Sequence, residues 1–109
     1  MGTISLTKLS TELLDQARAA NSGRAAHTLH GGHDTRLRQT MIALVAGQEL
    51  AEHASPEEAT LHVITGKASL TTATGSTEAS AGKLLTIPSE RHALVALEDT
   101  VVLLTVLAR

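Results

Sequence analysis

The sequence predicts an all-β domain that closes into a small barrel and carries one short helix at its N-terminus. Short apolar runs recur along residues 37–108, and Gly, Pro or a pair of acidic residues separates most of them. Such spacing is typical of sandwiches and barrels. After residue 23 no segment has the apolar period of a helix, and a parallel α/β fold needs helices between its strands. The 109 residues suffice for one core and one domain.

The helix is predicted over residues 10–20. Ser10 is a suitable N-cap, and the Asn-Ser-Gly sequence at 21–23 is a suitable stop. An apolar stripe at helical spacing should pack on the barrel exterior or on a partner, and it consists of Leu13, Leu14, Ala17 and Ala20.

The strands follow in order. Residues 24–36 read as a short strand and a polar loop around Gly31-Gly32. Residues 67–80 form a hairpin that turns at residues 74–76. Alternating or continuous apolar runs predict the other strands at 37–46, 59–66, 83–87, 92–98 and 101–108.

The composition excludes several classes of function. The chain has no Phe, Tyr or Trp, and therefore no aromatic platform for bases or sugars. It has no Cys, and its net charge of −2 includes no basic cluster for nucleic acid or anionic membranes. No stretch is apolar enough for a membrane span or a signal peptide, so a cytoplasmic location is the default expectation. An all-aliphatic core this small gains from a partner, which predicts a homodimer with an apolar interface.

Two spaced motifs carry a resemblance to a known family. The first, GQELAEHASPEEATLHVITG, places His53 six residues after its first glycine; the second, GKLLTIPSERH, places Pro88 six residues after its glycine and ends at His92. The chain resembles the small single-domain cupins of bacteria. The resemblance implies a double-stranded β-helix, or jelly-roll barrel, over residues 37–109, preceded by a helix and a strand extension over residues 1–36.

The resemblance also implies a site. Many cupins bind a divalent metal through two histidines and a glutamate of the first motif and a histidine of the second. Here His53 and His92 match, and Ser55 stands at the second histidine position. The glutamate position falls on Ala59, and Glu58 is one residue early. A bulge could turn Glu58 into the barrel; without one, strand alternation puts it in solvent. The site therefore either binds Mn, Fe, Ni, Cu or Zn weakly or contains no metal.

Other polar residues are also candidates for the pocket or its surroundings. Gln39 shares a face with Met41, and this face is predicted to line the pocket together with Ser55 and Leu94. His62 should lie on the outward face. A second cluster, His27, His30 and His33, surrounds Gly31-Gly32 and predicts a polar loop rather than a metal site. The resemblance to small cupins implies that this loop lies over the barrel mouth or in a dimer contact.

These residues predict a small-molecule-binding barrel. If the chain is an enzyme, His53 or His92 is the candidate general acid or base. Isomerase, lyase and dioxygenase chemistry all occur among the proteins it resembles, and whether the chain is an enzyme stays open. The alternative is a non-catalytic ligand-binding or sensor-type cupin module, or a structural dimer without metal.

Overall fold

The computed structural model describes residues 2–53 and 58–107, with backbone only at 51–53. Within these residues no helix has both the length and the apolar character needed to cross a membrane. The described elements follow one another as α1 (Leu6–Ala19), β1 (Arg24–His30), β2 (Leu37–Leu44), β3 (Glu49–His53), β4 (Glu58–Thr65), β5 (Lys67–Thr72), β6 (Gly75–Ser80), β7 (Leu84–Thr86), β8 (His92–Ala96) and β9 (Thr100–Leu107).

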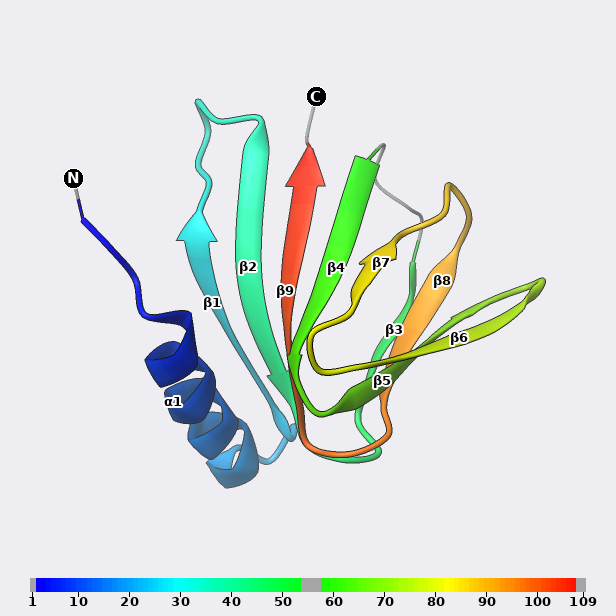
Figure 1. Cartoon of the computed structure of the whole chain (residues 1–109), viewed down its shortest axis with the longest axis horizontal. Helices are drawn as coiled ribbons and strands as arrows, with labels where there is room; N and C mark the ends of the chain where they lie inside the picture. Colours follow the sequence, from blue (N-terminus) through cyan, green and yellow to red (C-terminus); the bar gives the residue numbers. More distant parts are fainter. Residues whose placement is uncertain (1, 54–57, 108–109) are drawn as a thin grey trace.

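The strands form two antiparallel sheets. One has the order β1-β2-β9-β4-β7 and the other the order β3-β8-β5-β6. Figure 1 shows the two sheets converging at one end, below, and diverging at the other, where the β1–β2 and β7–β8 connections lie. We call these the closed and the open end. The predicted all-β jelly roll with one short helix is therefore confirmed.

The barrel core lies between the two sheets and is entirely aliphatic. Alternate residues of each strand reach it, because side chains two apart share a face of a sheet. The core residues less than a tenth exposed are Leu44, Ala59, Leu61, Val63, Ala68, Leu70, Ala79, Ile87, Leu94, Ala96 and Val102.

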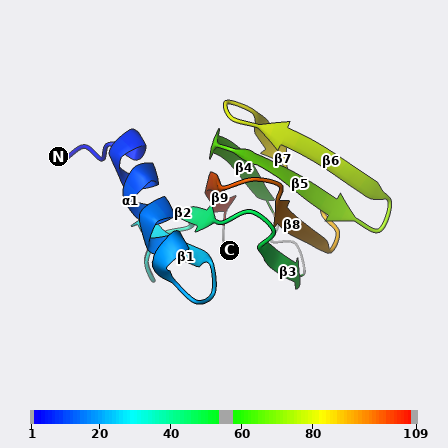
Figure 2. The ribbon, with the colours of Figure 1, turned by 90° about the horizontal axis from the view of Figure 1, so that it is seen from below.

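A second apolar cluster lies on the outer face of the five-stranded sheet. Leu13 and Ala17 of α1 pack there on Met41, Ala43 and Val101. Figure 2 shows α1 on the far side of this sheet from the four-stranded sheet. The prediction that the helical stripe covers the barrel exterior is thus confirmed.

The helix begins earlier than predicted. Its N-cap is Ser5, whose Oγ accepts a hydrogen bond from Lys8 N at 3.2 Å, so the expected cap at Ser10 is wrong. Ser10 is instead buried in mid-helix, where its Oγ donates to the Leu6 carbonyl at 2.7 Å. A serine side chain can hydrogen-bond to a nearby backbone group either at the start of a helix or within it, so the sequence allows either serine to be the N-cap. The packing of Ser10 against Met41 places Ser10 within the helix and leaves Ser5 as the cap.

Strand β3 has no counterpart among the strands predicted from the apolar pattern. Its sequence, Glu-Leu-Ala-Glu-His, contains no β-branched or aromatic residue, and such sequences have low strand propensity. Its pairing with β8 supplies the stability that its local sequence lacks.

Candidate functional site

His92 is the buried histidine at the open end of the barrel. It is 3% exposed and shares the inward face of β8 with Leu94 and Ala96. Its Nδ1 lies 3.0 Å from the Glu90 carbonyl oxygen. A carbonyl oxygen can only accept, so Nδ1 carries the proton and a neutral ring has its lone pair on Nε2. His92 and Leu94 thus both lie on the inward face of β8, as predicted.

His53 ends β3 directly opposite His92. Their Cα atoms are partners in the antiparallel β3–β8 pair, and Thr72 of β5 is the partner of His92 on the other side. The side chain of His53 and the whole of Ser55 lie outside the described residues.

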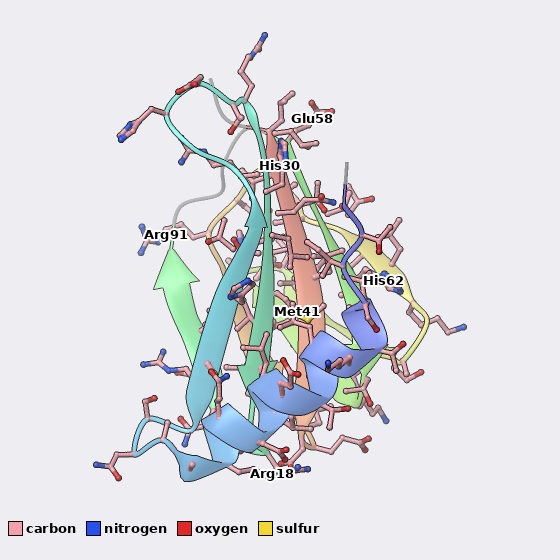
Figure 3. All side chains as sticks on the ribbon, turned by 90° about the vertical axis from the view of Figure 1, so that its left-hand side faces the viewer. Arg18, His30, Met41, Glu58, His62 and Arg91 are labelled. Atoms are coloured by element: carbon pink, nitrogen blue, oxygen red, sulfur yellow. The ribbon has the colours of Figure 1, made fainter. Side chains whose placement is uncertain are left out.

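Glu58 does not reach the barrel interior. It is the first residue of β4, it is exposed, and it pairs with Leu107, whereas its neighbour Ala59 is 8% exposed in the barrel core. The strand alternates regularly here, so Glu58 lies on the outer face near the open end (Figure 3). The structure therefore removes Glu58 from the ligand set.

The described side chains do not form a complete set of ligands for a divalent metal. Among the side chains at residues 2–50 and 58–107, no three His, Asp or Glu converge. The inward position that would carry the glutamate holds Ala59, which has no donor atom. Catalytic zinc sites use three protein ligands, and the matched positions here provide two imidazoles. We derive no chemistry through a metal.

The expectation that Gln39 and Met41 line the pocket is wrong. They do share a face of β2, but it is the outer one: Met41 is fully buried beneath α1 (Figure 3). Gln39 Nε2 donates to Thr105 Oγ1 of β9 at 3.3 Å on the same face. Both faces of β2 carry apolar residues because the helix covers one and the second sheet the other, so alternation alone does not tell which is inside.

The opposite face of β2 brings an unpredicted polar pair to the barrel. Ile42 and Leu44 pack in or against the barrel core, which puts Arg38 and Thr40 on the inward side nearer the open end. Thr28 of β1 is the cross-strand partner of Thr40. The alternation of β2 already groups Arg38 and Thr40 with Ile42 and Leu44. The sequence prediction missed the pair because it assigned the other face of β2 to the pocket.

A cavity of about 400 Å³ opens between the two sheets, and it is lined by neighbours of His92 but not by His92 itself. It includes Thr72, the strand partner of His92, and Glu90, whose carbonyl accepts from the ring. Apolar walls and several hydroxyls face it from both sheets, among them Leu70, Leu85, Pro88, Ser76 and Thr77.

The other histidines do not extend this site. His27 and His30 are exposed and stand opposite Met41 and Gln39, which places them on the outer face. His62 pairs with Leu103 and Leu84 and is half-buried on the outer face, as predicted. His33 is exposed in the β1–β2 loop.

No protein-family model and no curated protein matches the sequence. Solved structures do match. A cupin superfamily protein from Desulfitobacterium hafniense superposes with a TM-score of 0.72 at 15% identity, over 79% of this chain and 78% of that one. The chain has the cupin fold. The resemblance to small cupins is thereby confirmed at the level of the fold.

Two further solved structures also match. A conserved protein of unknown function from Streptococcus pyogenes is 28% identical, with a TM-score of 0.73 over 83% of this chain and 78% of that one. A salicylate 1,2-dioxygenase from Pseudaminobacter salicylatoxidans matches 90% of this chain but only 32% of its own, at 17% identity and a TM-score of 0.74. At that identity the second likeness shows the fold alone.

Proposed function

We propose that this cupin domain binds a small molecule at the open end of its barrel, in contact with His92. The observation that supports this proposal is a histidine buried on the inward face, with Nδ1 hydrogen-bonded to the Glu90 carbonyl. Glu90 and Thr72, the strand partner of His92, line a cavity of about 400 Å³. Burying a polar ring costs free energy unless its nitrogens are hydrogen-bonded. A ring fixed in one tautomer and one orientation is suited to act as a specific polar group of a binding site.

The ligand that this arrangement supports has an apolar body and at least one hydroxyl or N–H group. Leu70 and Leu85 provide apolar contact. Thr72, the strand partner of His92, provides a hydroxyl that also bonds to Thr74 Oγ1 within the β5–β6 turn. Small-molecule sites combine apolar walls with a few polar groups in this way. The ring of His92 would form a polar contact with that group of the ligand. We place His53 at the same site, on the strength of its register opposite His92.

The proposal is tested by screening small alcohols, amides and carboxylates against the isotope-labelled chain by NMR. Fragments that bind should shift signals of Leu70, Leu94 and His92. His92→Gln should then abolish their binding, and His62→Gln, the same substitution on the outer face, should leave it unchanged.

Binding confined to outer-face residues, or affinities equal in wild type and His92→Gln, would contradict the proposal. Thr72→Val is a second test should His92→Gln fold poorly, because it removes a cavity hydroxyl and keeps the side-chain shape. It should weaken fragment binding without shifting the signals of the helix.

A further inference from the structure

An arginine at the open end of the barrel has no role in the site described so far. The inward positions of β2 are Arg38, Thr40, Ile42 and Leu44, polar toward the open end and apolar toward the closed one. Arg38 is the cross-strand partner of Val106, which in turn pairs with Ala59. Arg38, Val106 and Ala59 are the inward residues of the five-stranded sheet that lie nearest the open end. His92 and Thr72 are the corresponding residues of the four-stranded sheet.

Arg38 lines a groove of about 400 Å³ near the β1–β2 loop. The groove combines one guanidinium, two hydroxyls and a glycine pair, and its lining residues are Thr28, Gly31, Gly32, His33, Arg38 and Thr40. No acidic side chain lines the groove, whose charged or titratable residues are Arg38 and His33.

Gly31 sets the position of the arginine stem. Its φ is +139°, and a Cβ built there would lie 3.1 Å from Arg38 Cγ and 3.4 Å from Arg38 Cβ. The missing side chain lets the loop backbone close onto the aliphatic part of Arg38. The stem is thereby held against the loop, which lowers the entropy that the guanidinium loses on binding a ligand.

No described carboxylate neutralises this arginine. In the part of the chain that the structure describes, ion pairs are formed by Arg18 with Asp15 and Asp99, and by Lys67 with Glu78. Arg38 is exposed, so its guanidinium can reach a ligand from solvent. An inward cation with adjacent hydroxyl donors is a suitable receptor for an oxyanion.

We propose that the ligand carries a carboxylate and that this group binds in the Arg38 groove. The inference rests on the proposed function and specifies its ligand class. A guanidinium donates two parallel hydrogen bonds to the two oxygens of one carboxylate, and the hydroxyls of Thr28 and Thr40 supply further donors. One fixed positive charge balances one negative charge, so a carboxylate fits this donor set better than a phosphate dianion.

The test compares three probes on the isotope-labelled full chain: hexanoate, its neutral counterpart hexanamide, and inorganic phosphate. Hexanoate should shift the amide signals of Thr28, Gly31, Gly32 and Thr40, and hexanamide should not. Arg38→Gln should weaken hexanoate binding about tenfold or more, the effect expected for lost hydrogen bonds to a charged group. Arg38→Lys should recover only part of the affinity, because an ammonium cannot form the paired bonds.

Arg36→Gln is the matched control, since it removes the same charge two residues away from a side chain that does not line the groove. It should change hexanoate affinity by less than about twofold. Equal losses in the two variants would mean a diffuse charge effect and would overturn the proposal. So would groove shifts with hexanamide, tighter groove binding of phosphate, or no groove shifts at all.

The signals of His92 and Leu94 separate this inference from the function on which it rests. If hexanamide shifts them without touching the groove, the barrel ligand stands and the carboxylate site is wrong. If hexanoate shifts the groove alone, the carboxylate site stands and the barrel function is wrong.

Discussion

The Arg18 guanidinium at the end of α1 holds the Asp99 carboxylate in the turn between β8 and β9. Arg18 Nη2 and Nε lie 2.9 and 3.0 Å from Asp99 Oδ2, while Oδ1 accepts the Ala46 amide at 2.9 Å. One carboxylate thereby ties the helix to two connections at the closed end. The Ala46 hydrogen bond, followed by that of Arg18, lowers the pKa of Asp99 below its usual value.

This lowered pKa predicts how stability depends on pH. A carboxyl whose folded pKa is depressed stabilises the fold above its unfolded pKa, about 3.9, and loses that contribution as pH falls through the folded value. Asp99→Asn should therefore unfold at lower urea concentration than wild type at pH 7, and the difference should shrink below about pH 4. Urea unfolding at pH 7 and at pH 3 measures both.

Asp15→Asn is the control for this prediction, because Asp15 also pairs with Arg18 but at 3.5 Å and with 70% of its side chain exposed. Its effect should be near zero at both pH values. A difference between Asp99→Asn and wild type that is constant down to pH 3 would assign the effect to some cause other than the charge of Asp99.

A glycine at the same end predicts a stability difference between two equivalent substitutions. Gly66 has φ +86°, and a Cβ there would overlap the Asp99 carbonyl oxygen and lie 2.8 Å from Thr100 Cα. Gly82 has φ +87°, but nothing lies within 4 Å of its Cβ position. Gly82→Ala should cost about 1–2 kcal/mol for the backbone conformation alone, and Gly66→Ala should cost clearly more. Equal losses in urea unfolding would show that the contact with residues 99–100 is relaxed at no cost.

The strand order of this fold could not be deduced from local pattern, but most strand positions could. The hairpin predicted to turn at residues 74–76 is β5–β6, whose strands end at Thr72 and begin at Gly75. Apolar residues bounded by Gly and Pro specify such elements locally. The β2–β9 and β9–β4 pairings join segments far apart in sequence, which local periodicity cannot predict. The two glycine-spaced motifs indicated the jelly-roll fold through their resemblance to cupins.

The candidate site was predictable in part for a related reason. The inward face of β8 carries His92, which ends the second motif, and Leu94, which follows two residues later on the same strand. Gln39 and Met41 were placed on the wrong side because β2 is buried on both faces, by α1 and by the second sheet. The same error concealed Arg38, whose inward position follows once Ile42 is known to pack against the barrel core.

Association of two copies stays a prediction, and the structure suggests where to test it. Leu84 of β7 is 65% exposed and Leu37 of β2 is 43% exposed, both on the outer face that α1 leaves uncovered. We expect light scattering to give about twice the 11.3 kDa chain mass at micromolar concentration. Leu84→Glu should produce monomers, whereas Leu97→Glu, which changes a 45% exposed leucine in the β8–β9 turn, should not. A wild-type monomer would end this prediction.

Ala59 offers a direct test of why the donor set falls short of a metal site. It points inward at the open end, in the position where the related motif has glutamate, and it is 8% exposed. Ala59→Glu should therefore add a carboxylate ligand to the two histidines. Without metal the variant should be less stable than wild type, because a buried carboxylate is costly. Ni²⁺ or Mn²⁺ at a hundred times its dissociation constant should restore about 2.7 kcal/mol.

Matched variants test whether the stability regained with metal comes from coordination of the metal by the introduced glutamate. Ala59→Gln has the same size without the charge and should gain no stability from metal. Ala59→Glu combined with His92→Ala should also gain none, because a ligand is again missing. Thermal unfolding with and without each metal reports all three. If Ala59→Gln responds as Ala59→Glu does, the metal binds elsewhere on the chain. If wild type responds as strongly as Ala59→Glu, two imidazoles already suffice and our account of the site must change.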